Sequence, residues 1–502
     1  MCGIIGGSIT LVLGIALVVV STVITFVFIP GVIEDLIIKE VVLLNNTEQF
    51  KRFEEVPFAL NFTIRFFNIT NKEEVLAGGV PEVTEVGPYN YKLYQRREIE
   101  SIEDDVITYR RVERLEFDAE GSYPYTENDT VTIANVPYNA ILQVAETMFA
   151  SLMGIMNNVL GEVFGKYNSP VIDVGVREFL FDGILLCENP RIIGRVVCNQ
   201  LKNIGANSNN LIVQDDGSII FSLLASKEQP SSLYKVYRGI NNAEDLGRII
   251  SLNGSTSFDI WVHEELEVGE TSAGVCNMIN GTDSGLYNPF VNRDKSLYAI
   301  NTDICRSVEI RYQYDTEYAG IPAVRFAANE WLLDNDDGCF CINVTKGINK
   351  DNGCLLKGAM ELFNCVGAPL VLSYPHFLYA DPTYANGVIG LSPDKEKHRI
   401  ILELEPNTGT VLNGAKRAQF NVFLRPITSV SATSNLNVTL TPILWIQESV
   451  LLPEVFMDQL RDRLLMPLNL VSILFPIIIA LCCVVFIVGL AIIIKAKLCK
   501  KD

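Results

Sequence analysis

The cysteines are the residues whose chemistry the sequence constrains most. Eight of the twelve lie in the middle of the chain: Cys187, Cys198, Cys276, Cys305, Cys339, Cys341, Cys354 and Cys365. Zinc sites favour Cys-x-x-Cys pairs, and the nearest match here is Cys339-x-Cys341. An even number of cysteines is typical of a disulfide framework made in an oxidising compartment. Eight cysteines allow 105 pairings. Cys187 and Cys198 stand apart from the other six and predict one local bond.

A second chemical pattern is Asn-x-Ser/Thr, the acceptor of N-linked glycans. Eight such sites occur, at Asn45, Asn61, Asn68, Asn128, Asn253, Asn280, Asn343 and Asn437. A site of this kind is modified only if it passes through the secretory lumen. The sequons and the cysteines therefore both predict that the middle of the chain lies outside the cell or in a lumen.

The residues that carry enzyme chemistry are sparse. The chain has three histidines, His263, His376 and His398, and it lacks a Gly-x-Ser-x-Gly elbow, a His-Glu-x-x-His helix and a Walker-type phosphate loop. His376 follows Tyr374-Pro375 in an apolar setting that favours a buried structural histidine. The stretch 334–338 begins like a calcium loop, but its glycine is fifth rather than sixth and no Glu stands twelfth. We therefore expect no catalytic site, no cofactor and no metal.

Charge excludes one class of partner. The 40 basic and 59 acidic side chains give a formal net charge of −19. Nucleic-acid binding requires a basic surface, which this composition does not supply. An acidic exterior suits the solubility of a glycosylated surface domain.

These residues lie between two long apolar runs at the ends of the chain. The runs cover residues 3–29 and 464–494, and each exceeds the roughly 20 residues that a helix needs to cross a bilayer. Lys495, Lys497, Lys500 and Lys501 follow the second run and predict a cytosolic C-terminal tail. The first run lacks the basic start and short apolar core of a signal peptide, so it reads as an uncleaved anchor that ends at Pro30.

This pattern divides the chain into four parts. We expect a cytosolic stub and transmembrane helix over 1–30, a lumenal or extracellular domain over 31–463, a transmembrane helix over 464–494 and a basic cytosolic tail over 495–502. Cys2 and Cys499 flank the spans on the cytosolic side and are candidates for palmitoylation. Cys482 and Cys483 lie inside the second span and should be free thiols.

Strands predominate in the large domain. Residues 56–120, 396–405 and 419–424 are rich in β-forming residues, and Asn-Gly and Asp-Gly turns separate the apolar runs. Residues 138–164 differ, because apolar residues recur there at helical spacing and leave Gln143 and Glu146 for the solvent side. A second helix is expected over 171–186. The apolar stripes fit either a packed helical core or an exposed lipid-receiving face, while Glu146 and Glu162 argue against a third span.

A series of motifs, in order along the chain, resembles the class B scavenger receptors. That family includes fatty acid translocase (platelet glycoprotein IV) and lysosomal integral membrane protein type 2. The motifs are Glu85-Val-Gly-Pro-Tyr-Asn-Tyr91, Cys276-Asn-Met-Ile-Asn-Gly-Thr-Asp283, Asp303-Ile-Cys-Arg-Ser307, Pro375-His-Phe-Leu378, Glu405-Pro-Asn-Thr-Gly409, Ala415-Lys-Arg-Ala-Gln-Phe-Asn421 and Pro442-Ile-Leu-Trp445. The resemblance covers essentially the whole chain.

The resemblance implies an α+β fold: a large antiparallel β-barrel with an apical helical bundle, over 137–200 here, and two terminal transmembrane helices. It also implies a lipid-carrying tunnel through the barrel. The family's cysteine pattern would pair Cys276 with Cys339, Cys305 with Cys365 and Cys341 with Cys354. The bond between Cys187 and Cys198 lies outside that pattern and rests on their positions alone.

The resemblance also places a ligand entrance at the apex. Arg177-Glu178-Phe-Leu180 resembles the family's apical Arg-Glu-Leu-Leu, and Lys166 falls near the reactive lysines of fatty acid translocase. Together with the apolar stripes, these residues predict an entrance made by Met148, Phe149, Leu152, Met153, Met156, Lys166, Arg177 and Glu178. Residues 137–200 contain four basic and six acidic side chains and no histidine. A basic capture surface and an apical histidine switch are therefore not expected.

The functional expectation is a scavenger-type receptor of the plasma membrane. It would bind fatty acids, sterols, other lipids or lipoprotein particles and pass them through an apolar tunnel to the membrane, because each buried CH₂ gains roughly 0.8 kcal/mol. The alternative is an endosomal or lysosomal glycoprotein that exports lipid or serves as a cargo or phagocytic receptor, although the tail lacks an acidic dileucine signal. A homo-oligomer remains open.

Overall fold

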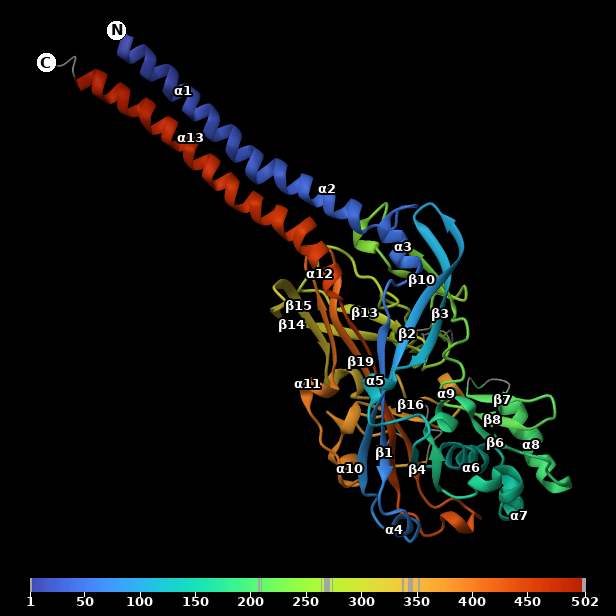
Figure 1. The fold of residues 1–502 in the computed structure, drawn as a ribbon. Helices are drawn as coiled ribbons and strands as arrows, with labels where there is room; N and C mark the ends of the chain where they lie inside the picture. The colour runs from blue at the N-terminus through green and yellow to red at the C-terminus, as the bar shows by residue number, and fades with distance from the viewer. Residues whose placement is uncertain are drawn as a thin grey trace.

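The two ends of the chain form a pair of helices that project from a β-rich body (Figure 1). The computed structural model describes residues 2–205, 208, 210–262, 264–265, 271–272, 274–335, 338–341, 346–350 and 353–498. The outer ends of α1 and α13 lie at the far end of the helical pair, away from the body. The two helices are long and apolar enough to cross a membrane over Ile5–Val41 and Glu454–Leu498.

Each membrane helix extends beyond its apolar run into the base of the body. The first comprises α1 (Cys2–Val23), a π-helical turn (Ile24–Phe28) and α2 (Ile29–Val41). The second comprises α12 (Glu454–Leu460), a π-helical turn (Arg461–Leu465) and α13 (Met466–Leu498). The helix continues past Pro30, the expected end of the first span, as far as Val41. Pro30 stands in the first turn of α2, directly after the π-helical turn, where its missing N–H is tolerated.

An antiparallel sheet forms most of the body. Its strand order is β10-β9-β3-β2-β1-β20-β19-β18-β15-β14-β13, and short strands β16 (Met360–Glu361) and β17 (Val371–Ser373) join it beside β19. The main strands are β1 (Leu60–Ile69), β2 (Val83–Glu103), β3 (Val106–Phe117), β9 (Leu233–Tyr237), β10 (Ile249–Leu252), β13 (Leu297–Asn301), β14 (Arg306–Tyr318), β15 (Ile321–Ala328), β18 (Ile400–Leu404), β19 (Val411–Leu424) and β20 (Thr439–Leu451). The predicted α+β class with a large antiparallel sheet is confirmed.

The two edges of this sheet do not pair with each other within the described residues, so the strands alone do not form the predicted closed barrel. A short segment at Gly281–Thr282 contacts both edges instead. Ile249 N of β10 donates to Gly281 O at 2.9 Å, and Ile300 N of β13 donates to Thr282 O at 2.8 Å. Thr282 N in turn donates to Tyr298 O at 3.2 Å. One extended segment therefore satisfies backbone groups on both edges.

Helices gather at the end of the body opposite the membrane helices (Figure 1). They are α6 (Val136–Met148), α7 (Met153–Phe164) and α8 (Ile192–Gly205), with a 3₁₀ turn (Ala150–Leu152) between the first two. The predicted helix over 138–164 is therefore present but broken at Phe149, whose φ and ψ are −130° and 44°. Gln143 and Glu146, expected to face solvent, instead bond inward: Gln143 is buried and donates to Phe423 O at 3.0 Å.

The helix expected over 171–186 is wrong. Residues Val171–Gly175 form β5, which pairs with β4 (Thr130–Ala134). Ile184–Leu186 form β6, which pairs with β8 (Ile219–Phe221), and β8 pairs on its other side with β7 (Leu211–Val213). A π-helical turn (Glu178–Asp182) lies between β5 and β6 and ends at Gly183, whose φ is 89°. β-Branched residues at 171, 172 and 174 favour the extended form, which the helical periodicity concealed.

Short elements complete the body. They are α3 (Glu48–Glu54), α4 (Lys72–Leu76), α5 (Ala119–Ser122), α9 (Phe363–Val366), α10 (Pro382–Asn386), α11 (Lys395–His398), strands β11 (Glu264–Glu265) and β12 (Thr271–Ser272), and 3₁₀ turns at Gly165–Tyr167, Ala243–Asp245, Val275–Asn277, Glu330–Leu333, Pro375–Phe377 and Ser431–Thr433.

Four disulfides link segments of the body. They join Cys187 to Cys198, Cys276 to Cys339, Cys305 to Cys365 and Cys341 to Cys354. These are the same four pairs that the resemblance and the positions of Cys187 and Cys198 predict. Cys482 and Cys483 of α13 are free.

Candidate functional site

A cavity of about 760 Å³ extends from the base of the membrane helices into the body. Val32 and Leu36 of α2 and Val471 of α13 line it at one end, and Leu370 and Leu372 line it inside the body. Its volume lies within the roughly 300–1,000 Å³ of small-molecule sites, which are also concave and mostly apolar. The cavity therefore connects the region of the membrane helices with the interior of the sheet.

Strands β19 and β20 form part of the wall of this cavity. Ala418 lies opposite Ile446 and Lys416 lies opposite Glu448, and all four line the cavity. Arg417 is also among the lining residues, and it bonds Gln447 Oε1 of β20 at 2.8 Å.

One polar group of the wall is a buried ion pair. Arg97 Nη2 and Asp283 Oδ2 lie 2.7 Å apart, and each side chain is 3% exposed. The Tyr109 hydroxyl also donates to Asp283 Oδ2 at 2.8 Å. Burial opposes the ionisation of Asp283, but Arg97 and Arg111 together hold its pKa below the usual range. Asp283 is thus a charged carboxylate whose oxygens are occupied by the protein.

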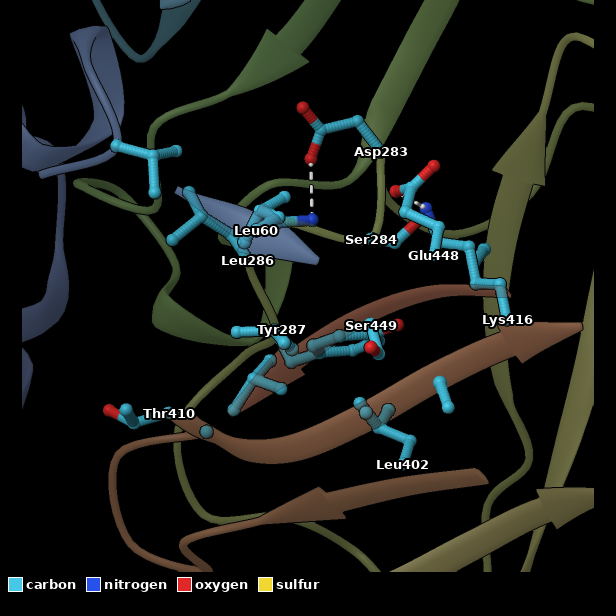
Figure 2. Close-up of a pocket in the computed structure, with 18 of the residues that line it drawn as sticks. Leu60, Asp283, Ser284, Leu286, Tyr287, Leu402, Thr410, Lys416, Glu448 and Ser449 are labelled. Carbon is cyan, nitrogen blue, oxygen red and sulfur yellow. Dashed lines mark hydrogen bonds and ion pairs between the residues drawn. The ribbon is translucent and has the colours of Figure 1, made fainter. Parts of the chain in front are cut away.

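A second polar group lies beside the first and centres on Lys227. Its Nζ is 3.1 Å from Glu113 Oε2, 3.4 Å from Asp303 Oδ2 and 3.8 Å from Glu448 Oε2. Glu448 also accepts from Lys416 Nζ at 2.9 Å. Burial disfavours the charge on Lys227, but these carboxylates outweigh it and raise the pKa of Lys227 above its usual range. Figure 2 shows Asp283, Glu448 and Lys416 around the same cavity as Leu60 and Leu402.

The predicted apical entrance lies in a different part of the molecule from the cavity. Met148 is 56% exposed and Phe149 is half-buried, whereas Met153 and Met156 are buried. The structure does not describe the side chain of Leu152. None of these residues, nor Lys166, Arg177 or Glu178, lines the cavity formed by the described residues. The structure therefore does not connect the apical group to the cavity.

The charged apical residues pair with one another. Lys166 Nζ lies 3.0 Å from Glu178 Oε1, and the Tyr167 hydroxyl donates to Glu178 Oε2 at 2.6 Å. Arg177 pairs with Glu127 at 2.9 Å and with Asp182 at 3.2 Å. Hydrogen bonds with Tyr167 and Glu178 raise the pKa of Lys166, so its ammonium is charged at neutral pH. The sequence placed Lys166 and Glu178 at the apex but did not show that they bond each other.

The sequence analysis missed an exposed apolar group on α8. Ile192, Ile193 and Val196 are 84%, 53% and 48% exposed. Ile192 and Ile193 are adjacent, and Val196 lies one turn farther along α8. This helix packs beside α7 at the membrane-distal end (Figure 1). An i, i+1, i+4 pattern of large apolar residues next to charged neighbours was a detectable signal.

The predicted glycan acceptors are accessible where the structure describes them. Asn45, Asn61, Asn128, Asn253 and Asn437 are exposed, and Asn68 and Asn280 are half-buried. Asn343 lies outside the described residues, as do Cys499 and the side chain of Cys2. Glycosylation and palmitoylation at these positions stay predictions.

The two described histidines are buried and bonded within the protein. His376 is 5% exposed, lies 2.8 Å from Glu85 Oε2 through Nε2, and accepts from Ser392 N at 3.1 Å through Nδ1. Its ring stacks on His398 at 4.5 Å between centroids. His263 lies outside the described residues, and no cluster of metal-ligating side chains is found among the described residues.

Comparison with known proteins agrees with this architecture. The CD36 family model matches residues 12–493. Sensory neuron membrane protein 2 of Drosophila melanogaster is 33% identical and covers 92% of each chain; that of Aedes aegypti is 35% identical and covers 86% of this chain and 88% of its own. Sensory neuron membrane protein 1 of Manduca sexta is 32% identical, and the match covers 92% of this chain and 86% of its own. A solved Salmonella typhi OmpF chain overlaps with a TM-score of 0.13, which supports no argument.

The chain belongs to the CD36 family. The predicted resemblance to class B scavenger receptors is thereby confirmed, because the sensory neuron membrane proteins belong to that same family. The two apolar terminal helices and the large domain between them make it a two-span membrane protein. Members of this family are membrane receptors that bind lipids.

Proposed function

We propose that this protein is a cell-surface receptor that binds lipids or lipoprotein particles at its membrane-distal end and passes single lipid molecules through its interior to the membrane. Residues 31–463 form the outer domain in this proposal, and both chain ends lie in the cytosol. Fatty acids, sterols and phospholipids are the general ligand class. No covalent step is required, because the apolar interior itself lowers the free energy of the lipid tail.

The cavity that opens between the membrane helices and the sheet is the observation that carries this proposal. Its lining includes Val32 and Leu36 of α2, Pro467 and Val471 of α13, and Leu372 from deep in the body. A hydrocarbon chain leaving such a cavity would meet the acyl region of the bilayer without crossing water. The free energy at stake is roughly 0.8 kcal/mol for each CH₂ that stays out of water.

The backbone contacts at Gly281–Thr282 support a barrel around this cavity. This segment bonds Ile249 of β10 on one side and Ile300 of β13 on the other. We infer that it acts as the closing strand, which leaves neither sheet edge open to water or to another chain. Asp283, the next residue, then holds Arg97 at the cavity wall.

Exposed apolar residues of α6 and α8 supply the docking surface in this proposal. Met148, Ile192, Ile193 and Val196 expose apolar surface at the end farthest from the membrane helices. Contiguous apolar exposure of this kind marks interaction sites in soluble domains. Lys166, Arg177 and Glu178 form the charged rim beside it.

Filling the cavity tests the proposal directly. Ala418→Trp adds a bulky ring opposite Ile446, whereas Ala119→Trp places the same ring on the exposed surface of α5 and serves as the matched control. Cells that express each variant at equal surface level would be given lipoprotein particles carrying tritiated cholesteryl ester. We expect Ala418→Trp to lower lipid uptake severalfold while particle docking stays at the wild-type level. Wild-type uptake by Ala418→Trp would contradict the internal route.

A further inference from the structure

Two histidine rings hold a short segment against the outer flank of the sheet. Residues 390–398, here called the latch, contain the short helix α11 and lie on the flank opposite α8 (Figure 1). At one end of the latch, Ile389 N donates to Pro81 O at 2.9 Å and Ile389 O accepts from Val83 N at 2.8 Å. At the other end, Arg399 O accepts from Arg417 Nη1 at 2.5 Å. Both ends are therefore fixed to strands, whereas the middle depends on other contacts.

Each histidine accepts a backbone N–H of the latch through its Nδ1 atom. His376, in the turn Pro375–Phe377, accepts from Ser392 N at 3.1 Å, and His398 of the latch accepts from Asp394 N at 2.9 Å. A backbone nitrogen can only donate, so both Nδ1 atoms are unprotonated and each neutral ring carries its proton on Nε2. His376 Nε2 accordingly lies 2.8 Å from Glu85 Oε2. The two rings stack at 4.5 Å between centroids and so join the latch to the body.

The body holds His376 in one position. Its φ of 55° is left-handed, a conformation that few residues other than glycine adopt. Its N–H donates to Gln419 Oε1 at 2.6 Å, and its ring meets the ring of Phe67 edge-on at 5.0 Å between centroids. His376 and His398 are each 5% exposed. A ring that gains a proton therefore cannot turn into water while the latch stays closed.

The charged neighbours of the rings oppose one another. They are two carboxylates and two guanidiniums: Glu85 of β2, Asp394 of the latch, Arg65 of β1, which lies 3.4 Å from Glu85, and Arg417 of β19. Burial, and then the neighbouring His376, outweigh the carboxylates and lower the pKa of His398 to about 4. The closed latch thus disfavours a charged His398.

A second proton on either ring must occupy Nδ1, where the N–H of Ser392 or Asp394 already points. Protonation turns each acceptor into a donor and replaces a hydrogen bond with a contact between two N–H groups. Two charged rings 4.5 Å apart would also repel each other. With the latch open, the rings reach water, where a histidine takes up a proton near pH 6.5. Acid therefore favours the open form.

The remaining polar contacts of the latch pass through Glu396. Its two carboxylate oxygens accept from Arg325 Nη2 and Arg399 Nη2, each at 2.5 Å. The side chain of Glu396 is 60% exposed, whereas those of Arg325 and Arg399 are 12% and 3% exposed. An ion pair with so exposed a partner adds little stability. Opening would take Glu396 away and leave the two guanidiniums uncovered.

We propose that residues 390–398 form an acid-operated latch that is closed at neutral pH and opens when His376 and His398 take up protons. Opening separates Glu396 from Arg325 and Arg399, so this flank of the molecule gains positive charge in an acidified compartment and not at neutral pH. The latch lies on the outside of the sheet and acts independently of any route for lipid through the interior.

Hydrogen exchange of the full-length chain in nanodiscs at pH 7.5 and pH 5 tests the latch. Rates are converted to protection factors, which removes the intrinsic effect of pH on exchange. His398 alone, with a pKa of about 4 in the closed latch and about 6.5 when free, raises the open fraction about thirtyfold between these pH values. We expect protection of the latch amides to fall about thirtyfold or more, while β15 keeps its protection.

Three variants assign the response to the histidines. His398→Asn keeps an acceptor for Asp394 N and cannot titrate, so the fall in protection should shrink to severalfold or less. Glu396→Gln weakens the ion pairs to Arg325 and Arg399, so protection should be lower at both pH values with the same ratio between them. Lys397→Gln, at an exposed position of α11, is the matched control and should respond like the wild type.

Four outcomes would overturn the latch. The first is equal protection of residues 390–398 at both pH values in the wild type. The second is a fall that β15 shares, because the whole domain then unfolds. The third is a full fall in His398→Asn, which would exclude that ring as the trigger. The fourth is loss of the pH response in Glu396→Gln, which would assign the response to that carboxylate instead.

Discussion

Gly14 of α1 lies directly against the backbone of Phe486 in α13. A Cβ atom built on Gly14 would lie 2.5 Å from the Phe486 Cα, and one built on Gly489 would lie 2.5 Å from Leu11 N. Side chains do not approach backbone atoms so closely, so both positions require glycine at this helix separation. Small residues allow membrane helices to gain van der Waals contact in this way, because lipid supplies no hydrophobic drive between them.

Replacing Gly14 with Leu should push the membrane helices apart. We expect a lower thermal unfolding midpoint for the full chain in nanodiscs, equivalent to about 1–3 kcal/mol, as for other overpacked sites. Gly6→Leu is the matched control, because no atom lies within 4 Å of a Cβ built on Gly6. The control also carries the same gain in helix propensity. Equal midpoints for the two variants would show that the helices do not pack through Gly14.

The apical apolar group should be needed for docking. The double variant Ile192→Asp/Val196→Asp places two charges on exposed apolar surface of α8, so particle binding to expressing cells should fall severalfold. Ile102→Asp is the control, because Ile102 is exposed at the β2–β3 turn, away from α8. Surface expression and the disulfide pattern of each variant would be checked first. Unchanged binding by the double variant would place docking elsewhere.

Glu146 should stabilise the contact between α6 and the segment after β19. It lies 2.7 Å from Arg425 Nη2 and accepts from Thr428 N at 2.9 Å, and its side chain is 9% exposed. Burial opposes its charge, but the bonds from Thr428 and Arg425 lower its pKa to about 2. A carboxyl whose pKa is depressed by folding adds stability above its unfolded pKa, and this stability is lost as the pH falls toward 2.

Glu146→Gln removes that charge. We expect a loss of roughly 2 kcal/mol of unfolding free energy at pH 7 and a flatter dependence of stability on pH below about 4.5. Urea unfolding of the full chain at several pH values measures both effects. Glu120→Gln, at an exposed position on α5, is the control and should behave like the wild type. An acid profile that Glu146→Gln leaves unaltered would contradict the assigned role.

The sequence predicted the elements that depend on local pattern. The two membrane helices and most long strands follow from runs of apolar and β-forming residues, whose signal is contained within a few turns or a single strand. The error over 171–186 has the same origin. Valine and isoleucine at 171, 172 and 174 fit a helical stripe equally well, and only the partner strand at Thr130–Ala134 decides the extended form.

The cavity wall could not be predicted, because its residues meet only in the folded chain. Arg97 and Asp283 are 186 positions apart, and Lys227 is farther still from Glu448 along the chain. In an acidic chain each of these carboxylates has many counterparts that serve only solubility. The pairing of Lys416 with Glu448 depends on the register between β19 and β20, which no short sequence pattern specifies.

His398 stacks on His376 beside the sheet, and its protonation should make the stability of the fold depend on pH. His398 is 5% exposed, its ring lies 4.5 Å from that of His376, and its Nδ1 accepts from Asp394 N at 2.9 Å. Burial, and then the neighbouring His376, lower the pKa of His398 to about 4, although Glu85 and Asp394 act in the opposite direction. His398 is therefore neutral in the folded protein over the whole range in which an unfolded histidine becomes charged.

Acid should weaken the fold through His398. Between about pH 6.5 and pH 4 the unfolded chain gains a proton that the folded chain does not, so the unfolding free energy should fall by up to roughly 3 kcal/mol across this window. His398→Asn keeps an acceptor for Asp394 N and cannot titrate, so its stability should fall less over the same range. Thermal unfolding of both proteins at pH 7.5, 6, 5 and 4.5 measures the difference. Parallel curves for the wild type and His398→Asn would show that another group carries the acid sensitivity.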